Sequence, residues 1–137
     1  MKILFTDLDG TLLNRDKKIS SENLEAIDYA SRQGNITVIS TGRSLSSALP
    51  YIEELASVQK QSYAIIYNGG LIYDCTSQKI LYKKTIPLPY VQYIFQQAKK
   101  FHIHCQTSVL KGKNISACFR MESFLKKRVI NILRLFH

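Results

Sequence analysis

Two carboxylates spaced two residues apart, Asp7 and Asp9, directly follow a short apolar run at residues 3–5. A run of this length is too short for a helix and predicts a buried strand, so both acids lie where the chain leaves a sheet. Two such acids can converge on one reacting centre, one as nucleophile and the other as proton donor. Gly10 then supplies a backbone bend that a side chain would hinder. The alternative is a turn with capping acids, which the preceding strand and the glycine disfavour.

Two further groups of polar residues follow apolar runs in the same way. Thr41, Gly42 and Arg43 come after the run at 36–39, and Asn68 comes after a third predicted strand at 63–67. Helical spacing predicts one helix from Ser20 or Ser21 to Gly34 and another from Ser44, which gives the order strand, helix, strand, helix, strand. That order predicts a parallel sheet with right-handed crossovers. The polar loops should therefore converge at one sheet edge.

The rest of the chain has other patterns. Residues 71–73 and 80–82 predict a hairpin, residues 91–101 a helix and residues 103–107 a short strand. Apolar residues between 121 and 136 recur at helical spacing and predict an amphipathic helix with a basic opposite face. Such a helix could dock on an acidic membrane or a nucleic acid, but burial of its apolar face is the commoner use.

The quoted motifs together resemble the haloacid dehalogenase superfamily of phosphatases, and specifically its Cof-like branch. They are DLDGT at 7–11, STGR at 40–43 and NGG at 68–70, and the resemblance covers about the first 107 residues. It implies an α/β fold: a partial Rossmann-like parallel sheet with helices on both faces, followed by the start of an inserted α/β cap. Residues 1–85 would form the first half of the core, and residues 86–137 a partial cap with a divergent basic C-terminal segment.

The resemblance also implies roles for the residues of the first two loops. Asp7 would attack phosphorus to give an aspartyl-phosphate and would ligate Mg²⁺. Asp9 would protonate the leaving oxygen, later activate water, and touch the metal through its main-chain carbonyl. The Leu8 main-chain N–H, the Thr41 hydroxyl and Gly42 would bind the phosphoryl group. The cofactor would be Mg²⁺, which suits a cluster of oxygen ligands without His or Cys.

The sequence allows two interpretations each for Arg43 and Asn68. Arg43 could hold phosphate or brace its loop, and Asn68 could face the substrate or simply form a turn. Asp9 carries a further expectation. A proton donor near neutral pH needs a pKa above the usual carboxylate value of about 4, which calls for a closed and partly dry site.

The distribution of charge, the apolar runs and the cysteines restrict the classes of partner, the location and the cysteine chemistry that the sequence predicts. The 137 residues carry a net charge of +9, of which +6 lies in residues 108–137, so no basic patch spans the whole chain and no specific nucleic-acid partner is predicted. No apolar run could span a bilayer and no cleavable signal precedes the first strand, which predicts a cytoplasmic protein. Three widely spaced cysteines, with no CxxC pair, predict reduced thiols rather than disulfides or a zinc site.

The resemblance also implies a later lysine that neutralises the phosphate and a Gly-Asp element that completes the Mg²⁺ site, and no such acidic element occurs here after Asp74. The sequence therefore predicts a truncated phosphatase of small phosphorylated metabolites, weakly active or inactive alone, with sheet edges open to self-association. The basic composition after Thr107 suggests a frameshift or an early stop. The alternative function is that of a catalytically dead remnant acting as a binding module.

Overall fold

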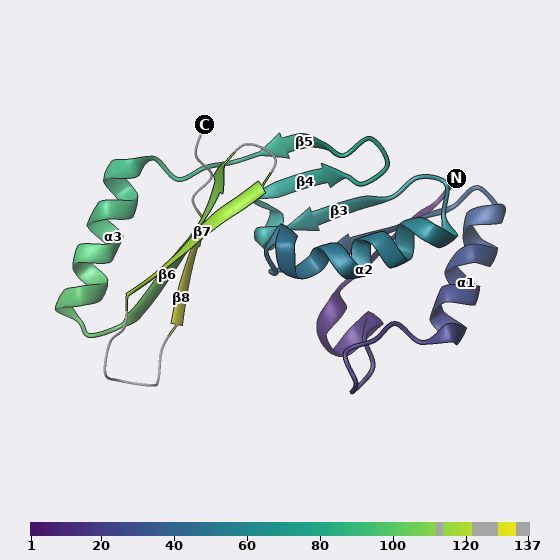
Figure 1. Cartoon of the computed structure of the whole chain (residues 1–137), viewed down its shortest axis with the longest axis horizontal. Coiled ribbons are helices and arrows are strands. Elements are labelled where there is room, and N and C mark those ends of the chain that lie inside the picture. The colour runs from purple at the N-terminus through teal and green to yellow at the C-terminus, as the bar shows by residue number, and fades with distance from the viewer. Residues whose placement is uncertain (112–113, 122–128, 134–137) are drawn as a thin grey trace. The chain divides into compact units, whose positions relative to one another are not determined.

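The structure is a computed structural model that describes residues 1–111, 114–121 and 129–133 (Figure 1). The chain divides into two compact units, Met1–Lys83 and Lys84–His137. The first unit contains a five-stranded sheet and the second a three-stranded sheet. This division falls close to the predicted boundary at residue 85, and the assignment of the units as core and cap stays a prediction.

The first unit alternates strands and helices and ends in a hairpin. Its elements are β1 (Ile3–Thr6), α1 (Ser21–Arg32), β2 (Ile36–Ser40), α2 (Leu45–Val58), β3 (Tyr63–Ile66), β4 (Leu71–Asp74) and β5 (Lys79–Lys83). The strands lie in the order β1-β2-β3-β4-β5, with β1, β2 and β3 parallel and the last two pairings antiparallel. The predicted strands, helices and hairpin are all present, and the sheet is mixed rather than wholly parallel.

Both helices start where the sequence places a serine cap. The Ser20 hydroxyl accepts the N–H of Asn23 at 3.3 Å, and the Ser44 hydroxyl accepts the N–H of Ser47 at the same distance. These bonds satisfy N–H groups that lack a partner in the first helical turn. After α1, Gly34 takes a φ of +77°, a left-handed conformation that reverses the chain toward β2.

Helices α1 and α2 lie over the same face of the sheet. They contact each other, and α1 contacts β2 while α2 contacts β3. Ile39, Ala64 and Ile66 point to this face and are buried. The predicted placement of helices on both faces is therefore not seen in the described residues of this unit. The reason is topological: two successive right-handed crossovers that run in one direction across a sheet leave both helices on one side.

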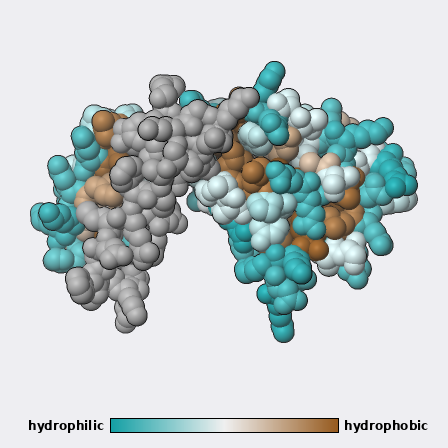
Figure 2. All heavy atoms as spheres, viewed as in Figure 1, coloured by the Kyte–Doolittle hydropathy of each residue, from teal (hydrophilic) through white to brown (hydrophobic). Residues whose placement is uncertain are grey.

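Strand β1 forms one edge of the sheet and exposes apolar side chains. Ile3 and Phe5, on the face opposite the helices, are 49% and 58% exposed, and Leu4 is also exposed. Figure 2 shows apolar side chains at the surface of this unit among polar ones. Edge strands with apolar side chains can pair with another chain. Self-association through this edge stays a prediction.

The second unit packs one helix on a small sheet. Helix α3 (Leu88–Lys100) contacts β6 (His104–Lys111), which pairs antiparallel with β7 (Asn114–Met121) and parallel with β8 (Val129–Leu133). Its core includes Val91, Ala98 and Cys105. In the part of the chain that the structure describes, no helix has the length and apolar character needed to cross a membrane.

The predicted amphipathic helix at 121–136 is wrong where the structure describes it. Met121 ends β7 and residues 129–133 form β8, while residues 122–128 and 134–137 lie outside the described residues. The sequence VINIL carries β-branched residues at three of five positions, and these favour a strand. Its apolar positions fit a helical stripe as well as a strand, so periodicity alone could not separate the two.

Candidate active site

The acidic loop begins immediately after β1. Asp7 precedes a single tight turn, η1 (Leu8–Leu12), in which the Leu12 N–H donates to the Asp7 carbonyl at 3.2 Å. Gly10 has a φ of +76°, which a residue with a side chain rarely adopts. Leu8 is fully buried, whereas Asp7 and Asp9 are exposed on either side of it. The buried leucine thus anchors the loop and leaves both carboxylates at the surface.

The loop after β2 is tied to the end of β3. The Thr41 N–H donates to the Ile65 carbonyl at 2.9 Å, and the Asn68 N–H donates to the Thr41 carbonyl at 3.2 Å. The Arg43 carbonyl accepts the N–H of Tyr67 at 3.0 Å. The Thr41 hydroxyl oxygen accepts the N–H of Arg43 at 3.3 Å, which leaves its own hydrogen able to donate elsewhere. The predicted convergence of these two loops is observed.

Asp7 leaves β1 beside the strand that leads into Thr41. Thr6 pairs with Ile39, two residues before Thr41, and neighbouring strands lie about 4.8 Å apart. The residues predicted from sequence therefore lie together at the carboxyl ends of the parallel strands. They are Asp7, Leu8, Asp9, Thr41, Gly42, Arg43 and Asn68. Their individual chemical roles stay predictions.

Gly42 and the Asn68 side chain are in close approach. A Cβ added at Gly42 would lie 2.7 Å from Asn68 Oδ1, closer than real contacts allow. Asn68 itself has a φ of +52°, in the left-handed region that asparagine tolerates. The close approach explains why a residue without a side chain suits position 42.

We expect Gly42→Ala to lower the free energy of unfolding by about 1–2 kcal/mol, because the added methyl group forces Asn68 to move. A second change, Asn68→Gly, removes the clashing side chain and suits the positive φ, so the double variant should recover most of the loss. Urea unfolding of the two single variants and the double variant measures this. A double variant no more stable than Gly42→Ala would contradict the explanation.

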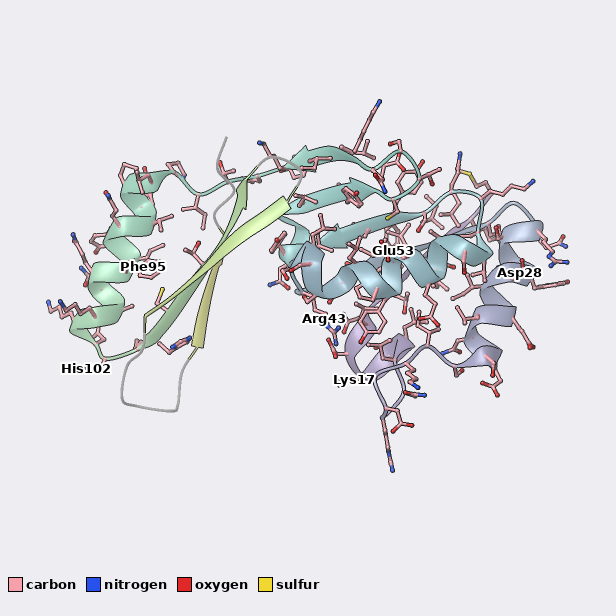
Figure 3. The ribbon with its side chains drawn as sticks, in the orientation of Figure 1. Lys17, Asp28, Arg43, Glu53, Phe95 and His102 are labelled. Carbon is pink, nitrogen blue, oxygen red and sulfur yellow. The ribbon has the colours of Figure 1, made fainter. Side chains whose placement is uncertain are left out.

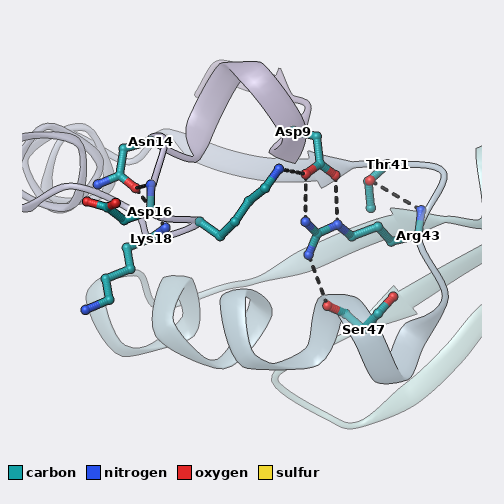
Figure 4. Close-up of polar contacts among 8 residues, drawn as sticks. Asp9, Asn14, Asp16, Lys18, Thr41, Arg43 and Ser47 are labelled. Carbon is teal, nitrogen blue, oxygen red and sulfur yellow. Dashed lines mark hydrogen bonds and ion pairs between the residues drawn. The ribbon is translucent and has the colours of Figure 1, made fainter.

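Asp9 lies between two cations (Figure 4). Arg43 donates from Nε to Asp9 Oδ2 at 2.8 Å and from Nη2 to Asp9 Oδ1 at 2.7 Å. Lys17 donates from Nζ to Asp9 Oδ1 at 2.9 Å. Figure 3 shows Lys17 and Arg43 approaching one another from different segments of the first unit. Asp9 thus joins the loop after β1 to the loop after β2.

These cations hold the pKa of Asp9 well below its ordinary value. Hydrogen bonds from Arg43 and then from Lys17 favour the charged carboxylate, and they outweigh the opposite effect of desolvation. The same contact with Asp9 raises the pKa of Arg43. The direction for Asp9 is the reverse of that expected for a proton donor. In this arrangement the contacts hold Asp9 as a carboxylate and also weaken it as a base.

Arg43 makes further contacts besides those with Asp9, whereas Lys17 was not among the site residues predicted from the sequence. Arg43 also donates to the Ser47 carbonyl at 3.4 Å, and its guanidinium lies 5.0 Å from the centre of the Tyr51 ring. Arg43 thus has bracing contacts here, and the choice between its two predicted roles stays a prediction. Sequence reasoning missed Lys17 and Tyr51. Asn14 signals a turn that could bring Lys17 near Asp9, but nothing in the sequence fixes the direction of the lysine.

No group of three or more His, Cys, Asp or Glu side chains is placed to hold a metal among the described residues. The predicted ligands are the Asp7 carboxylate and the main-chain carbonyl of Asp9. Both are oxygen donors, as Mg²⁺ prefers, and Mg²⁺ keeps several waters in such sites. The donor set therefore fits Mg²⁺ as part of a coordination shell. Of the free cysteines that the structure describes, Cys75 follows β4 in the first unit and Cys105 lies on β6 in the second.

Comparison with known proteins gives a consistent result. The sequence pattern of the haloacid dehalogenase-like hydrolases matches residues 4–128. A curated relative, 5-amino-6-(5-phospho-D-ribitylamino)uracil phosphatase YcsE from Bacillus subtilis (strain 168), is 32% identical over 110 residues, which cover 80% of this chain and 43% of that protein.

Solved structures agree with the sequence match. A haloacid dehalogenase-like hydrolase from B. subtilis superimposes with a TM-score of 0.65 at 31% identity, covering 76% of this chain and 35% of that one. A HAD/COF-like hydrolase from Plasmodium vivax gives a TM-score of 0.56 at 27% identity, covering 73% and 36%. The chain spans less than half the length of these proteins. The sequence match continues to residue 128, past the predicted end of the resemblance near Thr107. The frameshift or early stop inferred from the basic composition after Thr107 stays a prediction.

Proposed function

Because this chain belongs to the family of haloacid dehalogenase-like hydrolases, we propose that it carries the N-terminal part of a Mg²⁺-dependent phosphatase. The substrates would be small phosphorylated metabolites. The single observation that supports this most is the convergence of Asp9, the Thr41–Arg43 loop and Asn68 beside Asp7 at the edge of one sheet. A relative with 32% identity is named as a phosphatase of a phosphorylated ribityl compound.

The proposed reaction has two steps on Asp7. First a carboxylate oxygen of Asp7 forms a bond to phosphorus, the bond from phosphorus to the ester oxygen breaks, and that oxygen takes a proton from Asp9. Then a water attacks the same phosphorus, Asp9 accepts its proton, and inorganic phosphate leaves as the Asp7 carboxylate is restored. In the first step Asp9 would have to carry a proton, which its contacts with Arg43 and Lys17 disfavour in the arrangement described above.

The phosphoryl group would be held by the loop after β2. The Thr41 hydroxyl has a hydrogen to donate, and Gly42 lets the backbone come close. Helix α2 begins three residues later, and the N-terminus of a helix attracts anions. The Leu8 N–H would add a donor from the acidic loop. Asp7 and the Asp9 carbonyl would hold Mg²⁺, which when bound would offset the repulsion between carboxylate and phosphate.

The competing proposal is a binding module without catalysis. It is the alternative that the sequence leaves open, and the chain spans less than half the length of the relative named above. The phosphatase proposal requires that the chain bind a phosphate-like anion, whereas the binding or interaction module is not tied to that ligand. The predicted cytoplasmic location and weak activity stay part of this proposal.

Thermal unfolding with Mg²⁺ and tungstate, a phosphate mimic, tests the anion site. At ten times its dissociation constant tungstate should raise the melting temperature by about 5 °C, because a ligand that binds only the folded state stabilises it. Perchlorate at equal ionic strength serves as the control for salt effects. An equal shift with both anions would contradict a phosphate site.

A further inference from the structure

The hairpin at residues 13–19, which follows the acidic loop, is held by several internal hydrogen bonds. Leu13 and Ile19 pair as an isolated antiparallel bridge, and both are buried. Between them, the Asn14 N–H donates to the Lys18 carbonyl at 2.9 Å, and the Asn14 side-chain oxygen accepts the N–H groups of Asp16 and Lys18, each at 3.0 Å. The hairpin therefore holds its tip in a defined place.

Lys17 is the residue of this tip that reaches the site. Its φ of +59° lies in the left-handed region, which residues other than glycine rarely adopt, and its N–H donates to the Asn14 carbonyl at 3.1 Å. Its amine lies 2.9 Å from Asp9 Oδ1. Figure 4 shows that the neighbouring Lys18 extends away from Asp9. The hairpin thus presents one particular lysine to the acidic loop.

The two cations beside Asp9 differ in how firmly they are held. Arg43 makes two bonds to Asp9 and one to the Ser47 carbonyl, and its side chain is 23% exposed. Lys17 makes one bond to Asp9 in the part of the chain that the structure describes, and its side chain is 62% exposed. An ammonium group has three donors, so Lys17 can bind a second acceptor without releasing Asp9.

The contact between Lys17 and Asp9 determines which part of a bound substrate the amine of Lys17 could contact. In the proposed function Asp9 touches the leaving oxygen of the ester, while Thr41 and Gly42 hold the phosphoryl group. An amine one hydrogen bond from Asp9 therefore lies on the leaving-group side. The hairpin tip also carries Arg15, Lys17 and Lys18 against a single acid, Asp16, which gives it a positive potential.

We infer that Lys17 is a substrate-binding residue that selects phosphate monoesters whose alcohol part carries a carboxylate or a second phosphate next to the ester carbon. This inference rests on the proposed function and names its substrate class. The amine of Lys17 would bind the anionic group of the leaving alcohol, while Arg43 stays on Asp9 as a positioning residue.

Two probes that differ in that anionic group test the inference. Both 2-phosphoglycolate and 2-hydroxyethyl phosphate are small monoesters, and only the first carries a carboxylate. Titrations of the ¹⁵N-labelled full chain in Mg²⁺, followed by NMR, give their dissociation constants together with that of inorganic phosphate. We expect the chain to bind 2-phosphoglycolate about tenfold more tightly than 2-hydroxyethyl phosphate.

Lys17→Gln should abolish this preference, because the amine that binds the carboxylate is lost. Lys18→Gln removes the same charge from the same hairpin and should keep the preference. Equal binding of the two esters by the unaltered chain would overturn the inference and leave the proposed function standing, as would equal effects of the two variants. Failure of the unaltered chain to bind any of the three compounds would overturn both.

Discussion

Replacing Asp7 by Asn should lower the Mg²⁺-dependent hydrolysis of p-nitrophenyl phosphate at least about a hundredfold, to the rate of the buffer blank. The amide is a poor nucleophile and carries no charge for the metal, whereas its shape is nearly that of the carboxylate. Release of p-nitrophenol by the purified chain, followed over hours at high protein concentration, measures the effect even if the starting rate is low.

Asp28→Asn provides the control for this experiment. Asp28 lies on α1 and pairs with Arg32 at 2.7 Å, away from the loops after β1 and β2. The substitution makes the same chemical change and should leave the rate within about twofold. If Asp7→Asn and the unaltered chain hydrolyse the ester equally fast, the enzymatic proposal fails and the binding module is preferred.

Leu55→Ala should destabilise the first unit by about 3 kcal/mol. Leu55 lies on α2 with no exposed surface, and truncation of a buried leucine loses burial and leaves a cavity. A unit of this size is expected to have a total stability of only about 4–12 kcal/mol, so the loss is a large share of it. The midpoint of urea unfolding, followed by circular dichroism, reports the change.

Leu81→Ala makes the same change at a surface position. Leu81 lies on β5 of the same unit and is 56% exposed. Its truncation should change the free energy of unfolding by less than about 1 kcal/mol. Comparable losses for the two variants would mean that α2 does not pack against the sheet as described.

The pairing of Asp9 with two cations reverses the direction of its pKa shift relative to the one expected from the sequence. A closed and dry site was expected to raise its pKa, but Arg43 and Lys17 lower it instead. The sequence contained both cations, and it gave no distance between them and Asp9. Arg43 lies 34 residues away, and Lys17 is brought back by a hairpin. Contacts of this kind depend on where the loops are held by the rest of the unit.

Local patterns in the sequence were sufficient for most elements of the first unit. Serine caps and the glycine at 34 mark the helix ends, and short apolar runs mark the strands, because these signals act through bonds and conformations within a few residues. The alternation of strands and helices then required the loops after β1, β2 and β3 to meet at one edge. The order of elements, the location of the site and the family motifs were therefore determined by the sequence itself.

Only the tertiary structure decided three other features. It placed α1 and α2 on one face, made β8 a strand where the apolar spacing also fitted a helix, and brought Lys17 to Asp9. Each depends on interactions between segments far apart in the chain, in which burial and charge pairing select one arrangement from several that local preference permits. A lysine in a turn has many conformers of similar energy, and here Asp9 of the preceding loop pairs with the one that faces the site.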